Sequence, residues 1–322
     1  MKTIRVGDPH IRPDNLEESE RLMQFIYELA SSPDIGSLEF MGDQMHTHAV
    51  LRMEVIEFWM RWAKKFGSIV STKFIVGNHD QPGDYQRERN MNSMACLEGI
   101  SNVYVISTPW ISDKTLYIPH MSKQEDFIAA IEWAKGQHAN LSDHILICHQ
   151  TFNGSMYENG FYAKDGFEPS TVLEFKAVIC GHIHKQQKFA NIFYIGTPRW
   201  DSVSDANEDK GVWIFEGIDA KFVSTKKVCT PITSILLKEG DQLPEIPDGR
   251  VLVTLEGSQV WIASIGKNLK GKVRIIPKPT DARNKAKDAS NKLSSMESYA
   301  KHHKFDPNVT AKEVLDYLKG LA

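Results

Sequence analysis

The pattern of apolar and polar residues predicts alternating strands and helices over the first two thirds of the chain. Short apolar, β-branched runs such as "KTIRV", "KFIV" and "ILIC" predict buried strands. Apolar residues at helical spacing predict three helices, over 16–30, 50–66 and 124–135. Alternation of this kind indicates a layered α/β domain with sheet in the middle, spanning residues 1–228.

A second unit is predicted over 229–279, with two strands, a short helix capped by Ser258 and a closing strand. The remaining residues, 280–322, begin with a basic stretch and end in a predicted helix, where Thr310 and Glu313 fit a capping box. The apolar stripe of this helix comprises Val314, Leu315, Leu318 and Leu321. We therefore expect a small α+β capping domain followed by a C-terminal helical extension.

Composition is that of an ordinary globular protein. Hydrophobic residues make up 41% and charged residues 25% of the 322 positions. A net charge of −3 argues against a protein that coats nucleic acid nonspecifically, although a local basic groove stays compatible with it. We see no signal peptide and no apolar run near the ~20 residues of a membrane span. The four cysteines lack C-x-x-C spacing, which favours reduced residues of a cytoplasmic protein without membrane contact.

Side chains that can bind metals follow five of the predicted strands. They are Asp8 and His10; Asp43 and His46; Asn78, His79 and Asp80; His149; and His182 and His184. Loops past the carboxyl ends of parallel strands share one edge of a sheet, so these side chains can converge. Carboxylate, imidazole and amide oxygen are ligands of divalent cations, and a pair of cations needs a shared anionic ligand. The inventory predicts a two-metal site bridged by Asp43.

Each motif also has an ordinary structural interpretation. A single D-x-H occurs often by chance, "GD" after a strand is commonly a turn or a helix cap, and "GNHD" can be an Asx turn. "GHIH" alone fits a turn as well as a metal site. All of them occur here in one chain, each after a β run, and that combination favours the metal interpretation.

The order D-x-H, G-D, G-N-H-D, H, G-H-x-H resembles the calcineurin-like metallophosphoesterase superfamily over residues 1–225. The resemblance implies a β-sandwich flanked by helices and two cations. One cation would be held by Asp8, His10, Asp43 and His184, and the other by Asp43, Asn78, His149 and His182. His79 would be the acid beside the leaving oxygen, with Asp80 orienting it.

Within the superfamily, "GDQMHTH" and "GNHD" disfavour protein phosphatases, and the chain resembles the Mre11/SbcD nucleases, notably phage recombination nuclease subunits. His46 matches a histidine that this family uses in exonuclease action, and "HQ" and "YIGTPRWDSVSDANEDKGVWIFE" match further family segments. The resemblance implies a manganese-dependent 3′-to-5′ DNA exonuclease with single-strand endonuclease activity, magnesium being the alternative metal. It also implies a Rad50/SbcC-like ATPase partner bound through the C-terminal helices, a role in DNA recombination and repair, and a homodimer as a further arrangement. The compartment would be the host cytoplasm if the chain is phage-encoded.

Two other functions stay open at this point. A small-molecule phosphodiesterase or phosphatase of the same fold would use the same ligands, and a noncatalytic scaffold should have lost some of them. His46 could instead be a surface or cap residue at a helix start, and the tail lysines could contact phosphates. The remaining histidines outside the tail are expected to be structural or surface residues: His48, His120, His138 and His144.

Overall fold

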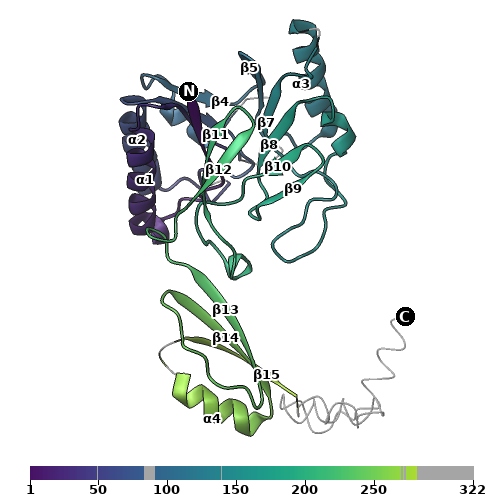
Figure 1. Cartoon of the computed structure of the whole chain (residues 1–322). Coiled ribbons are helices and arrows are strands. Elements are labelled where there is room, and N and C mark those ends of the chain that lie inside the picture. The colour runs from purple at the N-terminus through teal and green to yellow at the C-terminus, as the bar shows by residue number, and fades with distance from the viewer. Residues whose placement is uncertain (49, 83–90, 139, 270, 272, 281–322) are drawn as a thin grey trace, which may run out of the picture. The chain divides into compact units, whose positions relative to one another are not determined.

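The computed structural model describes residues 1–48, 50–82, 91–138, 140–269, 271 and 273–280. Its contacts divide the described residues into two compact units, with the division after residue 232. The first unit contains two six-stranded sheets with helices on their outer faces, which confirms the predicted layered α/β architecture (Figure 1). The predicted final helix, with its capping box and apolar stripe, lies outside the described residues.

The first sheet has the strand order β12-β11-β1-β2-β3-β4. These strands are β1 (Lys2–Val6), β2 (Ile35–Phe40), β3 (Ser71–Ile75), β4 (Val103–Ile106), β11 (Gly211–Glu216) and β12 (Asp219–Ser224). Strands β1 to β4 pair in parallel, and β11 and β12 add antiparallel ribbons. Helix α2 (Met53–Gly67) packs on this sheet through Trp59, whose ring lies 5.3 Å from that of Phe40 and 5.6 Å from that of Phe74. Helix α1 (Leu16–Ala30) lies beside α2 and buries Leu22 and Ile26.

The second sheet has the order β5-β6-β7-β8-β10-β9. These strands are β5 (Trp110–Ser112), β6 (Thr115–Ile118), β7 (Ile145–His149), β8 (Ala177–Gly181), β9 (Gln187–Phe189) and β10 (Ile192–Tyr194). Helix α3 (Gln124–Gln137) joins the apolar cluster on one face of this sheet through Phe127 and Ile131. A separate cluster joins the two sheets and includes Ile75, Ile147 and Ile179. Because β6, β7 and β8 pair in parallel, their carboxyl ends lie at the same edge of the second sheet.

The second unit has the predicted β-β-α-β order. It comprises β13 (Ile232–Lys238), β14 (Arg250–Gly257), α4 (Gln259–Leu269) and β15 (Arg274–Pro279), with β14 central and parallel to β15. Val253 and Leu255 of β14 are fully buried in its small core. The backbone N–H of Trp261 lies 3.3 Å from the Ser258 hydroxyl oxygen, which confirms the predicted cap.

Helix α1 has the predicted bounds, whereas α2 begins at Met53 rather than at residue 50, because the backbone at Arg52 is extended (φ −93°, ψ 130°). Strands β5, β9 and β12 were not predicted. All three lie at sheet edges and contain no buried residue, so their apolar pattern is weak. Among the helices of the described ranges, none has the length and apolarity that a membrane crossing requires.

Candidate metal centre

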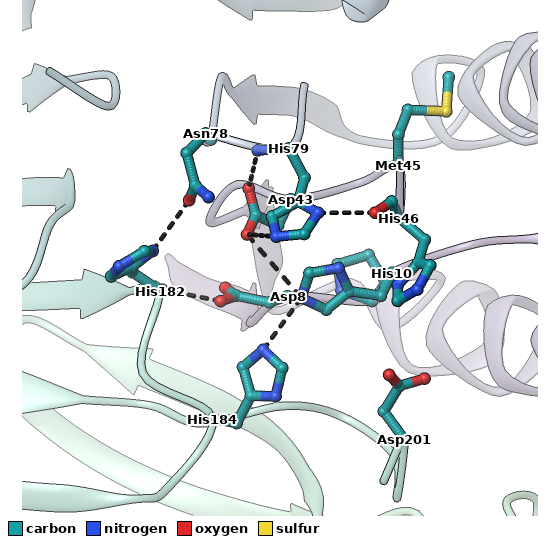
Figure 2. A network of polar contacts seen from close by, with 12 residues as sticks. Asp8, His10, Asp43, Met45, His46, Asn78, His79, His182, His184 and Asp201 are labelled. Atoms are coloured by element: carbon teal, nitrogen blue, oxygen red, sulfur yellow. Dashed lines mark hydrogen bonds and ion pairs between the residues drawn. The ribbon is translucent and has the colours of Figure 1, made fainter. Parts of the chain in front are cut away.

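The seven predicted metal-ligand side chains lie together at the carboxyl ends of β1, β2, β3, β7 and β8 (Figure 2). Each strand is buried at its carboxyl end. Most of the donor side chains follow directly in the loop, whereas His149 is the last residue of β7. Because these strands run parallel within each sheet, the five loops open at the same edge of the sandwich. The sequence positions span 8 to 184, so only the fold brings them together.

One group of donors consists of Asp8, His10 and His184, whose ligand atoms all lie within 4.8 Å of one another. The Nε2 atoms of His10 and His184 are 2.9 Å apart. The Asp8 Oδ2 atom accepts a hydrogen bond from the backbone N–H of His182 at 2.8 Å, which holds the carboxylate in place. Two imidazole nitrogens and a carboxylate therefore point into one small volume.

A second group consists of Asp43, His149 and His182, again within 4.8 Å. The Asn78 Oδ1 atom lies 3.0 Å from His149 Nε2 and 2.9 Å from His182 Nδ1, so it belongs to the same cluster. Asp43 faces both groups, since Oδ1 is 3.3 Å from His149 Nε2 and Oδ2 is 3.8 Å from His10 Nε2. This is the position expected of a bridging carboxylate.

The backbone turns sharply at several of these positions. His10, Asp43 and His182 have φ angles of 45°, 52° and 79°, in the left-handed region that non-glycine residues rarely adopt. Gly42 also has a positive φ, of 115°. Gly77 meets a different requirement, because a Cβ atom there would lie 2.2 Å from Asp43 Oδ1. The left-handed backbone at these turns, and the lack of a side chain at Gly77, allow the donor atoms to lie close together.

The charges of the cluster are unbalanced. Burial, opposed by His149 and assisted by the charge of Asp43, raises the pKa of Asp8 to about 6. Burial and the Asp43 charge raise the pKa of Asp80 to about 7. Burial lowers the pKa of His10 and of His182 well below the ordinary value, which keeps both imidazoles neutral. Burial would lower the pKa of His149, but the charges of Asp43 and Asp8 raise it to about 10, so this imidazole is the positive partner of the carboxylates. Crowded carboxylates with two neutral imidazoles beside them are a setting that a cation stabilises.

Two buried polar atoms of the first donor group have no hydrogen-bond partner in the protein, as expected of atoms beside a cation site. They are Oδ1 of Asp8 and Nδ1 of His10. Orphaned polar atoms of this kind are rare in native proteins and indicate a partner of another kind. Carboxylate and imidazole ligands together suit first-row divalent metals.

His79 lies at the rim of the cluster, with Nε2 3.9 Å from Asp43 Oδ2. Its Nδ1 atom faces the backbone oxygen of His46 at 2.6 Å. Asp80 was expected to orient His79. Its two carboxylate oxygens accept backbone N–H bonds, from Met45 at 3.0 Å and Gly77 at 2.9 Å, so Asp80 holds the turn that carries His79.

The ring of His46 lies beside the same cluster, 5.5 Å from the ring of His10 and 6.0 Å from that of His79 (Figure 2). Two histidines that were expected to be structural or surface residues also lie here. The His48 ring stacks on His79 at 4.1 Å, and the His120 ring lies 5.8 Å from that of His182. The alternating "HTH" spacing around residue 47 was the signal available for His48.

Two further residues hold the loop of His184 by its backbone and were not predicted. Glu158 accepts a hydrogen bond from the His184 N–H at 2.8 Å. Lys210 is fully buried and donates to the His184 carbonyl oxygen at 2.9 Å, while pairing with Asp205 at 2.7 Å and Glu208 at 2.9 Å. These contacts come from distant segments, so no local pattern indicates them.

A two-sheet sandwich with convergent aspartates and histidines at one edge defines a metal-dependent phosphoesterase, and comparisons with known proteins agree. A model of the family "Calcineurin-like phosphoesterase" matches residues 1–186, and the chain belongs to this family of hydrolases, which bind divalent metals. Exonuclease subunit 1 of Enterobacteria phage T4 is 26% identical over 227 residues, covering 67% of this chain. The match spans 65% of that relative's length.

Among solved structures, "GAP50 the anchor in the inner membrane complex of Plasmodium" superposes with a TM-score of 0.43 at 12% identity. The superposition covers 70% of this chain and 85% of that one. A likeness of this size carries no argument about function.

Proposed function

We propose that this chain is a two-metal DNA nuclease, a 3′-to-5′ exonuclease with single-strand endonuclease activity. The observation that carries the proposal is the convergence of two donor groups, joined by one carboxylate, at a single sheet edge. Paired cations of this kind serve in-line displacement at phosphorus. The choice of DNA is supported by the relative that is described as an exonuclease subunit.

We assign the residues that would hold each cation to two sets, on the basis of the donor groups and the resemblance in sequence. The first set is Asp8, His10, Asp43 and His184, and the second is Asp43, Asn78, His149 and His182. When bound, the cations supply the positive charge that activates water and neutralises the transferred phosphoryl group. Magnesium prefers oxygen ligands, so the imidazole-rich sets favour manganese.

His79 is proposed as the general acid. Its Nδ1–H donates to the His46 carbonyl oxygen, which leaves Nε2 as the atom that faces the cluster. In the imidazolium form, Nε2 carries the proton that a departing alkoxide needs. Asp80 acts through the backbone turn, and the His46 ring is proposed to contact the DNA end during exonuclease action.

The proposal is tested with His79→Ala and, as a matched control outside the cluster, His138→Ala. Duplex DNA labelled at the 3′ or the 5′ end is incubated with manganese or magnesium, and bound metal is measured by mass spectrometry. We expect His79→Ala to lose about 10²- to 10⁴-fold in cleavage rate while it keeps its metal. Wild-type-level cleavage would remove His79 from the mechanism.

The same assay separates the alternative substrate class. Hydrolysis of a chromogenic phosphodiester without any cleavage of DNA would favour a small-molecule phosphodiesterase. Release of mononucleotides from the 5′ end would contradict the proposed polarity.

We further propose that the protein works in DNA recombination and repair with a Rad50/SbcC-like ATPase, bound through residues 281–322. The relative's description as a subunit supports a partner. Deleting 281–322 should spare hydrolysis of the chromogenic diester and weaken co-purification with the ATPase. Undiminished co-purification would refute the assignment of that segment.

A further inference from the structure

The loop that follows the metal-site strand β7 displays two neighbouring aromatic side chains to solvent. We call residues 150–168 the β7 loop. Phe161 is 72% exposed and Tyr162 is 59% exposed, the largest values among the aromatic residues of the described ranges. Single exposed apolar side chains are common on protein surfaces and need no explanation. An adjacent aromatic pair, in a loop that is hydrogen-bonded to the metal-site loop, is a candidate contact for a ligand.

The β7 loop is built by hydrogen bonds. The backbone N–H of Tyr157 donates to the Phe161 carbonyl oxygen at 2.8 Å, and Met156 pairs with Tyr162 in an antiparallel bridge. The Gln187 side chain, from strand β9, makes two bonds of 2.7 Å to the backbone of Met156. The backbone that carries the two aromatic rings is therefore held in one arrangement.

The same loop is joined directly to the donor cluster. Glu158, three residues before Phe161, accepts the 2.8 Å hydrogen bond from the backbone N–H of His184. The His184 ring in turn lies 2.9 Å from His10 within the first donor group. One tight turn thus separates the aromatic pair from the residue that contacts the metal-site loop.

We propose that Phe161 and Tyr162 form a stacking platform for the unpaired nucleobase next to the scissile phosphate. This inference rests on the proposed nuclease function and deepens it by naming the substrate form, a single-stranded or frayed end. Aromatic side chains bind single strands by stacking on bases, and this contact tolerates any sequence. Bases inside a duplex are stacked on each other and cannot use such a platform.

The test compares intact oligonucleotides with ones that carry a single abasic site at the first, second or third nucleotide from the cleaved bond. An abasic site removes the base and keeps the phosphate backbone. The proteins are wild type, Phe161→Ala, Tyr162→Ala, the double variant, and Trp133→Ala. Trp133 is 44% exposed on α3 and serves as the matched control. Binding is measured by fluorescence anisotropy with calcium, and cleavage with manganese.

We expect the double variant to bind and cleave the intact single strand roughly tenfold less well, and Trp133→Ala to match wild type. Wild type should lose a similar factor on one abasic strand, and that loss should vanish in the double variant, because both changes remove the same contact. Hydrolysis of the chromogenic diester should stay unchanged in all variants. Replacing Phe161 by Trp should preserve binding.

Equal binding of intact and abasic strands by wild type would overturn the platform, and would point to a protein partner for this pair. Base-dependent binding without any DNA cleavage would overturn the proposed nuclease function and leave the platform standing. The two failures are therefore distinguishable.

Discussion

A buried charged group links the two sheets, and its removal tests how the sandwich is held together. Glu39 on β2 is 2% exposed and lies in register between Arg5 on β1 and Lys73 on β3. Its carboxylate accepts bonds from Arg5 at 2.7 Å and Lys73 at 3.2 Å. The Tyr117 hydroxyl, from β6 of the second sheet, donates to the same carboxylate at 2.6 Å. We predict that Glu39→Gln destabilises the first unit strongly.

The magnitude follows from these contacts. The glutamine keeps the shape but removes the charge, which leaves two buried cations uncompensated, at a cost of about 3–5 kcal/mol. Tyr117→Phe loses one hydrogen bond to a charged acceptor, about 1.5–3 kcal/mol. The double variant should lose less than the sum, by about 1 kcal/mol, because the hydroxyl then faces a neutral amide.

The assay is urea denaturation followed by tryptophan fluorescence. All tryptophans except Trp261 precede residue 232, so the signal reports the first unit. A change below about 1 kcal/mol for Glu39→Gln, or strict additivity with Tyr117→Phe, would refute the reasoning.

The contribution of Glu39 to stability should also depend on pH, in a direction that follows from its pKa. Burial alone would raise the pKa of Glu39, but Arg5 and Lys73 outweigh it and hold the pKa below the ordinary value of 4.5. A depressed folded-state pKa means that the stabilisation is complete above the unfolded value and is lost as pH falls through the folded one. The difference in stability between wild type and Glu39→Gln should therefore be constant above pH 4.5 and shrink below it.

Two changes at the candidate metal centre have equally definite outcomes. Gly77→Ala places a Cβ atom 2.2 Å from Asp43 Oδ1, which must displace this carboxylate. Isothermal titration calorimetry with manganese should therefore show at least one binding event weakened or lost. Binding equal to that of the wild type would contradict the tight packing at this position. His48→Phe keeps a ring against His79 but loses the 2.9 Å contact to the Asn78 carbonyl oxygen, whereas His48→Ala loses both. If stacking positions His79, kcat for DNA cleavage should fall several-fold more in the alanine variant than in the phenylalanine variant; equal rates would exclude a role for the stack.

The sequence alone predicted most of the helices and strands, and it predicted the side chains that lie together at the candidate metal centre. Helix α1 has its predicted bounds because its apolar residues repeat at helical spacing, a local property of the chain. The side chains of the candidate centre were predicted because they lie at the ends of apolar runs or just past them, and parallel strands of one sheet end at a common edge. The family comparison supports the same class of enzyme.

Only the tertiary structure decided which side chains face each other. Nothing in the segment "SLEF" indicates that a tyrosine of the other sheet will donate to Glu39. The spacing of "HTH" places His48 near His46 in sequence but does not indicate that its ring stacks on that of His79. Asp80 accepts hydrogen bonds from the backbone N–H groups of Met45 and Gly77, and nothing in the motif itself indicates these partners. The edge strands β5, β9 and β12 form by pairing with neighbours and bury too little to leave a pattern. The periodicity of apolar residues is a property of one segment and can be read from its sequence. Contacts between segments depend on strand register and on side-chain packing, which the whole chain determines together.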